Sequence, residues 1–151
     1  MDATNEDHQP LCPSARPEMD GAVIFGVVGG TAQEPRVAHL AQPLPVTDEL
    51  LALVEPASPL AVFRTAAPCA ASACLHFAAG RCRLATRIVE QLPEAVDGLP
   101  ACRIRPDCRW WQQEGPAACH RCPLVVTEMA NPSEALRQAT DPTVYTQNDA
   151  A

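Results

Sequence analysis

The sequence predicts a small α+β domain organised by bound metal, with few short strands and helices, a loop-rich cysteine region and disordered termini. The length of 151 residues suits one domain, and strand-like and helix-like segments occur in turn. Seven of the eight cysteines fall between Cys69 and Cys122. With 4% aromatic residues and 16 prolines the core is weak. Such a core gains from metal, because metal-binding free energy is also folding free energy.

We divide the chain into four segments. Residues 1–20 are acidic and lack periodicity, which predicts a disordered arm that carries Cys12 outside any metal site. Residues 21–65 are the strand-containing N-terminal part of the domain, and residues 66–126 are the cysteine-rich metal-cluster region. Residues 127–151 are predicted to form a short helix and a flexible tail.

Strand signals lie in the N-terminal part of the domain. The run Ala22–Val28 is rich in β-branched residues and ends at two glycines, which predicts a strand and a turn. Residues 36–40 are the expected antiparallel partner, and residues 61–64 form another strand. Residues 26–31 lack the lysine of a P-loop, so we interpret the glycines as a hairpin turn.

Helices are predicted from caps and apolar periodicity. Thr47 or Asp48 caps a helix that ends at Glu55 and presents four residues to a core: Leu50, Leu51, Leu53 and Val54. A second helix begins after Cys82, and its apolar face consists of Leu84, Ile88, Val89 and Leu92. A helical turn surrounds Trp110 and Trp111, with one ring in the core, and residues 131–134 cap a helix over 135–139.

The cysteines form two groups. The first consists of Cys69, Cys74 and Cys82, and the second consists of Cys102, Cys108, Cys119 and Cys122. Buried thiols and disulfides are the alternatives to metal ligation. The first ten residues lack the basic and apolar regions of a secretory signal, so we expect a cytoplasmic protein, in which dense cysteine indicates metal binding.

The spacing favours one or two [4Fe–4S] clusters over zinc. Structural zinc sites use two closely spaced cysteine pairs, and only Cys119 and Cys122 form one here. The wider gaps suit a bulkier cluster. Cys119–Pro123 resembles the end of the cysteine run in bacterial ferredoxins, although the chain lacks the preceding CxxCxxC part. The resemblance implies a second partition, in which Cys122 ligates the cluster of the first group.

Zinc remains the alternative cofactor. Cys74–Cys82 resembles the opening of CCCH zinc fingers, which bind single-stranded RNA. That family's spacing would place a cysteine at Ile88 and a histidine at Leu92, and neither is present. A zinc-stabilised interaction module that binds protein or nucleic acid is therefore the second hypothesis.

Seven thiols leave one group with three ligands. His76 or His120 completes it, or one iron keeps an open position. An open iron site would suit an iron–sulfur enzyme, which is the third hypothesis. No nucleophile–base pattern identifies catalytic residues.

Charge indicates the kind of partner. Residues 61–126 carry eight arginines and five acidic residues in a chain of net charge −7. We expect arginines to offset the negative charge of thiolate centres and to donate hydrogen bonds to sulfur, namely Arg81, Arg83, Arg103, Arg105, Arg109 and Arg121. The overall acidity makes nucleic acid a weaker partner than a redox or regulatory protein, and no apolar run predicts a membrane span. The sequence thus favours a bacterial iron–sulfur protein that acts in electron transfer or in redox or oxygen sensing.

Overall fold

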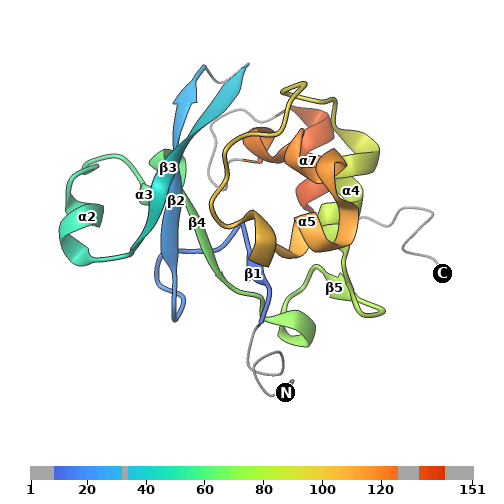
Figure 1. The fold of residues 1–151 in the computed structure, drawn as a ribbon, viewed down its shortest axis with the longest axis horizontal. Helices are drawn as coiled ribbons and strands as arrows, with labels where there is room; N and C mark the ends of the chain where they lie inside the picture. Colours follow the sequence, from blue (N-terminus) through green and yellow to red (C-terminus); the bar gives the residue numbers. More distant parts are fainter. Residues whose placement is uncertain (1–8, 32–33, 126–132, 142–151) are drawn as a thin grey trace.

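The protein is an antiparallel sheet packed beside a group of short helices, so the α+β prediction is confirmed (Figure 1). The computed structural model describes residues 9–31, 34–125 and 133–141. Residues 1–8 of the predicted disordered arm and residues 142–151 of the predicted tail lie outside these ranges. Among the described residues, no helix combines the length and the apolar character needed to cross a membrane.

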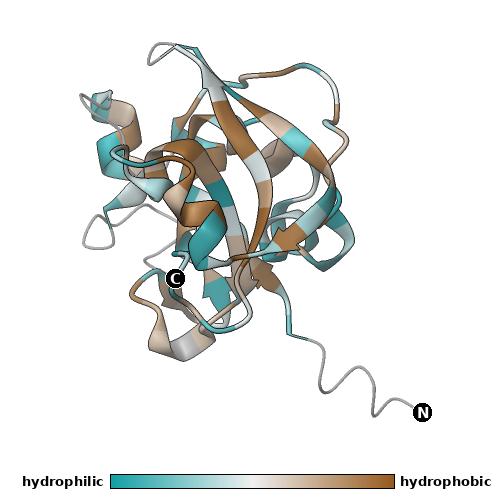
Figure 2. Ribbon diagram, turned by 90° about the vertical axis from the view of Figure 1, so that its left-hand side faces the viewer, coloured by the Kyte–Doolittle hydropathy of each residue, from teal (hydrophilic) through white to brown (hydrophobic). Residues whose placement is uncertain are grey.

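The sheet has four strands in the order β1-β4-β2-β3, all antiparallel. Their bounds are Leu11–Cys12 for β1, Val23–Gly30 for β2, Pro35–Pro45 for β3 and Phe63–Pro68 for β4. The predicted hairpin is confirmed, because β2 and β3 pair from Val23↔Pro45 to Gly30↔Pro35. Gly30, at the turn of this hairpin, has a φ of 73°, a conformation that favours glycine. Figure 2 shows both hydrophobic and hydrophilic residues along the strands.

The sequence prediction was wrong for the N-terminal segment from residue 9 to residue 20. Strand β1 pairs with β4, and Pro13 and Ala15 are buried. Ala15 donates a backbone hydrogen bond to Thr65 at 3.0 Å. This segment therefore belongs to the folded domain, because β1 extends the sheet and supplies part of its core.

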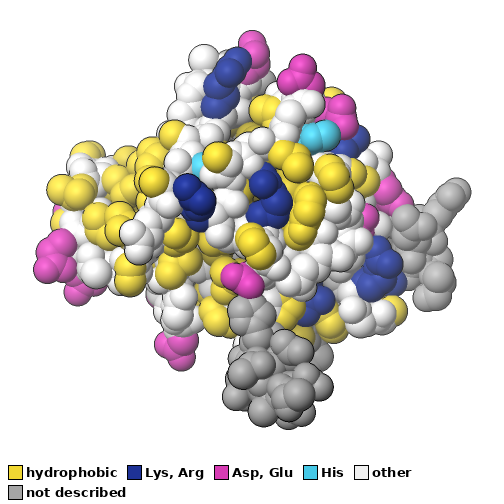
Figure 3. Space-filling view, viewed as in Figure 1, with side chains coloured by type: hydrophobic (Ala, Val, Ile, Leu, Met, Phe, Trp, Pro, Cys, Tyr) yellow, Lys and Arg dark blue, Asp and Glu magenta, His cyan; other side chains and the backbone are white. Residues whose placement is uncertain are grey.

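The connection between β3 and β4 differs from prediction in two respects. Helix α2 (Asp48–Ala52) is capped by Thr47 as expected, but it buries none of its residues, and Leu53 is 77% exposed. Hydrophobic side chains gather on the surface around it (Figure 3). Helix α3 (Pro59–Val62) occupies part of the predicted strand at 61–64, since Ser58 caps a turn that starts at Pro59.

The cysteine region contains more helix than the loop-rich prediction allowed. Its elements are η1 (Ala71–Ala73), β5 (Phe77–Ala78), β6 (Arg81–Cys82), α4 (Arg83–Gln91), η2 (Arg105–Asp107), α5 (Arg109–Glu114), α6 (Pro116–Cys119) and η3 (Cys122–Leu124). Helix α7 (Glu134–Thr140) packs on α4. The α4 helix follows Cys82 as predicted, and Leu84, Ile88 and Leu92 are buried on it.

The main core joins α4, α5 and α7, and two of the cysteines belong to it. Cys82 and Cys108 are each 8% exposed and pack with Trp110, which is 2% exposed. Trp111 is only partly buried, as expected for the neighbouring position on a short helix. The thiol groups are thus positioned by the packed helices and by the sheet edge.

Candidate metal centres

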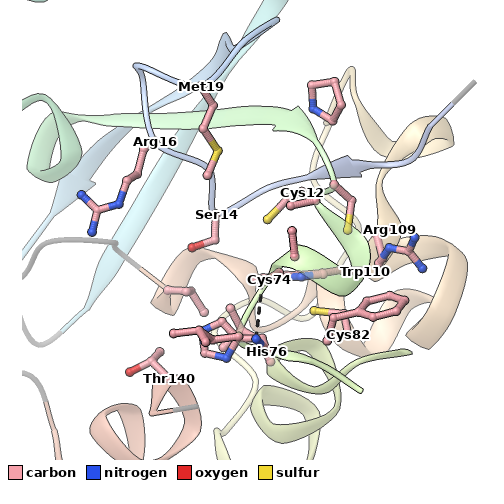
Figure 4. A pocket seen from close by; sticks show the side chains of 18 of the residues that line it. Cys12, Ser14, Arg16, Met19, Cys74, His76, Cys82, Arg109, Trp110 and Thr140 are labelled. Atoms are coloured by element: carbon pink, nitrogen blue, oxygen red, sulfur yellow. Dashed lines mark hydrogen bonds between the residues drawn. The ribbon is translucent and has the colours of Figure 1, made fainter. Parts of the chain in front are cut away.

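Four thiols line a cavity with a volume of about 610 Å³. Three of them are the predicted first group, Cys69, Cys74 and Cys82, and the fourth is Cys12. Figure 4 shows the Cys12, Cys74 and Cys82 side chains around the same space. We call these four residues the first thiol group.

Strand pairing and a small hairpin position this group. Cys12 lies opposite Ala67 in the β1–β4 ladder, and the Cys69 N–H donates to the Pro10 carbonyl at 2.8 Å. The β5–β6 hairpin carries the chain back to Cys82. From helix α5, the Gln113 side chain accepts from the Cys82 N–H at 2.9 Å and donates to its carbonyl at 2.8 Å. The backbone of Cys82 is therefore held from the element that also carries Trp110.

The second thiol group surrounds a smaller cavity of about 30 Å³, lined by Cys102, Cys108, Cys119 and Cys122. Cys108 precedes α5, Cys119 ends α6 and Cys122 begins η3. The structure thus places Cys122 with its sequence neighbours, and not with the first group as the ferredoxin-like partition implied. Trp110 lines both cavities, so one residue borders both thiol groups.

Backbone N–H groups face the thiols at a repeated spacing. Ala71 donates to Cys69 Sγ and His76 donates to Cys74 Sγ, each at 3.4 Å and from two residues further along the chain. The same spacing relates Ser14 to Cys12, Leu84 to Cys82, Ile104 to Cys102 and Trp110 to Cys108. Such donors stabilise thiolates, so six of the eight cysteines have a local geometry suited to the charged form.

Two arginines reach sulfur in the second group. The Arg64 Nη2 donates to Cys122 Sγ at 3.2 Å and to the Pro13 carbonyl at 2.9 Å, and its Nη1 donates to the Cys122 carbonyl at 2.7 Å. Burial raises the pKa of Cys119, and a hydrogen bond from Arg105 to the Cys119 thiol partly offsets that increase. Arg64 is only 1% exposed and was not among the arginines singled out in the sequence.

Four more of the arginines singled out in the sequence have other partners or lie on the surface, and Arg83 is buried at the start of α4. Arg81 forms an ion pair with Glu114 at 2.9 Å, and Arg121 donates to the carbonyls of Leu92 and Ala117. Arg109 lines the first cavity with its guanidinium 5.3 Å from the Phe77 ring centre, and Arg103 is exposed. Their proximity to the thiols in sequence did not predict contact with sulfur.

The two candidate histidines differ in position. His76 lines the first cavity, and its Nδ1 lies 2.9 Å from Arg87 Nη2. Burial, followed by the charge of Arg87, lowers the pKa of His76. His120 lines neither cavity and lies 3.1 Å from the Glu94 carboxylate. Of the two histidines, only His76 therefore lies where it could contact a metal bound by one of the thiol groups.

Burial makes five of the thiols harder to ionise. It raises the pKa of Cys12 and of Cys108 to about 12 and raises the pKa of Cys82, Cys102 and Cys119 as well. Neighbouring thiols of the same group add to the increase for Cys12 and Cys108. These five thiols are consequently neutral at pH 7 without metal, and metal binding must release their protons.

We expect the metal-free protein to lose stability as the pH rises above about 9, the ordinary pKa of a thiol here. In that range the unfolded chain releases thiol protons that the folded chain keeps, so the free energy of unfolding falls. The loss at pH 10 should be on the order of 1 kcal/mol for each strongly buried thiol. Urea unfolding at pH 7 and pH 10 measures it, and an unchanged midpoint would contradict the burial of these thiols.

Within the described ranges, no three Cys, His, Asp or Glu side chains converge closely enough to hold a single metal ion. No protein-family model, curated protein or solved structure matches the chain. The candidate centres therefore stand on their own geometry.

Sequence reasoning missed Cys12 and Arg64. A signal for Cys12 was present, because eight cysteines divide into two sets of four and Cys12 precedes a proline as Cys122 does. Arg64 had no such signal, since its contact with Cys122 spans 58 residues.

Proposed function

We propose that this protein binds iron–sulfur clusters at its thiol groups and acts in electron transfer or in redox or oxygen sensing. The observation that carries the proposal is the gathering of the first thiol group around a cavity of about 610 Å³. Thiolates are the ligands of both zinc and iron–sulfur clusters, so the size of the cavity that the thiols line is informative. A single ion needs far less room than this cavity offers.

The surroundings of the thiols favour a redox role. Backbone N–H groups and arginines donate to sulfur, and such hydrogen bonds set the potential of a cluster. Trp110 lines both cavities and would keep water from both centres. Two neighbouring centres across one side chain suit the passage of an electron from one to the other.

A protein partner and a cytoplasmic location remain part of the proposal. Leu75 is 82% exposed and Met19 is 43% exposed, and both line the first cavity. Exposed apolar side chains beside a redox centre offer a docking face for a redox or regulatory protein. The net charge of −7 continues to make nucleic acid the weaker partner.

A zinc-stabilised interaction module is the second candidate, and the second thiol group favours it. Its cavity of about 30 Å³ matches the volume of roughly one water molecule, which is closer to the needs of a single ion. An iron–sulfur enzyme with an open iron position is the third candidate, and it requires one group to lack a fourth ligand.

Metal and sulfide analysis of the anaerobically purified protein tests these alternatives. We expect a brown protein that contains iron and acid-labile sulfide. A colourless protein that contains only zinc would overturn the proposal and support the interaction module. Voltammetry followed by air exposure then separates the two roles: a centre that survives and cycles reversibly indicates electron transfer, whereas rapid loss indicates sensing.

We expect Arg64 to raise the potential of the second centre, because its positive charge lies 3.2 Å from Cys122 Sγ and favours the more negative, reduced state. Arg64→Lys keeps the charge but loses the planar set of donors, so the potential should fall by up to roughly 60 mV, a tenfold change for a one-electron couple. Voltammetry measures the shift.

Arg121→Lys is the matched control, because Arg121 is next to Cys122 in sequence but donates to carbonyl groups. In Arg121→Lys, the reduction potential of the second centre should match that of the unsubstituted protein. Equal shifts in both variants would contradict a specific role for Arg64.

A further inference from the structure

We propose that Cys12 is the fourth thiolate ligand of the first centre, so that each centre is held by four cysteines. The kind of metal group follows from the proposed function, whereas the identity of this ligand follows from the geometry of the cavity. The sequence had placed Cys12 outside any site.

The backbone brings Cys12 to the other three thiols and holds it there. The β1–β4 ladder sets Cys12 opposite Ala67, and the adjacent Cys69 N–H donates to Pro10 at 2.8 Å. A bridge between Leu11 and Cys108 fixes the other side of β1. The Cys12 side chain lines the cavity with Cys69, Cys74 and Cys82, close enough for their charges to act on it.

Cys12 also shares the local geometry of the other thiols. The Ser14 N–H faces its sulfur from two residues further along the chain, as the Ala71 N–H faces Cys69 and the His76 N–H faces Cys74. A backbone donor at this position stabilises a thiolate and orients it. The segment around Cys12 therefore has the same backbone geometry as the loops that carry the predicted ligands Cys69 and Cys74.

His76 is the other candidate for the fourth ligand, and its hydrogen bond with Arg87 disfavours metal ligation. Arg87 has only donors, so the His76 Nδ1 at 2.9 Å must accept. In the neutral imidazole the proton then lies on Nε2, and neither nitrogen offers a free lone pair to a metal. His76 ligation would require the loss of this contact, whereas Cys12 ligation requires only the loss of a thiol proton.

A second observation indicates that the cavity is filled in the working protein. Trp110 is 2% exposed, and its Nε1 has no hydrogen-bond partner in the part of the chain that the structure describes. In Figure 4 the indole lies between the Cys12 and Cys82 side chains. A buried N–H without an acceptor is unfavourable, and the sulfur atoms of a bound cluster would supply one.

Ligation replaces the Cys12 Sγ–H bond by an Sγ–metal bond, and the proton leaves to solvent. No electron is transferred. Four thiolates leave no open metal position in the first centre, which counts against an iron–sulfur enzyme.

Three single variants of the full chain, each reconstituted anaerobically with iron and sulfide, test the assignment. Cys12→Ala should lose about half of the bound iron or convert one cluster to a three-iron form visible by electron paramagnetic resonance. Ser14→Ala, which alters the same cavity without a ligand, and His76→Asn should retain the iron and sulfide of the unsubstituted protein. Unchanged iron and sulfide in Cys12→Ala would overturn the assignment, and loss of iron in His76→Asn would identify His76 as the fourth ligand instead.

Alkylation of the unsubstituted protein gives a readout that does not depend on a variant's folding. Mass spectrometry after iodoacetamide treatment in moderate urea, which exposes thiols that burial alone would shield, should find Cys12 protected in the loaded protein and modified after metal removal. Modification of Cys12 in the loaded protein would overturn the assignment. If the purified protein holds zinc without sulfide, the proposed function fails. The ligand assignment is then tested by zinc content: loss of zinc from Cys12→Ala supports it, and unchanged zinc overturns it.

Discussion

Replacing Trp110 by alanine should lower the free energy of unfolding of the metal-free protein by about 3–5 kcal/mol, a typical cost for removing a buried tryptophan. The indole is 2% exposed and packs in the core that joins α4, α5 and α7. Its removal would also join the two cavities, so we expect both centres to be lost or degraded. Urea unfolding and metal analysis measure the two effects.

Trp111→Ala is the matched control, because Trp111 follows on the same helix but is only partly buried and lies beside Arg105, 5.6 Å from ring centre to guanidinium. Trp111 lines the second cavity but not the first. Trp111→Ala should therefore cost clearly less stability than Trp110→Ala and leave the metal of the first centre unchanged. Trp110→Phe retains most of the volume and removes the N–H, so it should keep both centres with a changed potential. Equal losses for Trp110→Ala and Trp111→Ala would contradict the role of Trp110 as the shared wall.

Substitutions in the two thiol groups should act independently. Cys74→Ser should empty the first centre and leave the second, and Cys108→Ser should do the reverse, because the two residues line different cavities. Each variant should retain about half of the iron of the unsubstituted protein. Iron, sulfide and zinc analysis with absorption spectra checks the result.

Cys122→Ser decides between the two partitions that the sequence allowed. The structure places Cys122 with Cys108, so this variant should match Cys108→Ser in metal content and spectrum. A match to Cys74→Ser would instead support the ferredoxin-like exchange. Loss of both centres in all three variants would mean that the eight thiols form a single cooperative site.

Local patterns predicted the elements that are stabilised by neighbours in sequence. The β2–β3 hairpin follows from a β-branched run that ends at glycines, and α4 follows from apolar residues on one face with Pro93 beyond its end. Thr47 and Ser133 cap their helices as expected. Each of these signals lies within a few residues of the structure that it specifies.

The prediction was wrong for features that depend on distant contacts. The apolar residues of α2 had a helical pattern, but the helix buries none of its residues, and Leu53 at its C-terminal cap is 77% exposed. The acidic N-terminal segment had no periodicity, yet β1 gains its order from backbone pairing with β4, more than fifty residues away. Backbone pairing of a two-residue strand leaves no side-chain pattern to detect.

The sequence by itself determined the inventory of thiols, their grouping by spacing and the basic character of the segment that carries most of them. Only the tertiary structure decided that Cys12 joins Cys69, Cys74 and Cys82, that Cys122 stays with its neighbours, and that Arg64 is the buried arginine at sulfur. The physical reason is the range of the interactions. Spacing reports how residues within one turn or loop can converge, whereas these contacts depend on strand pairing and on packing around Trp110.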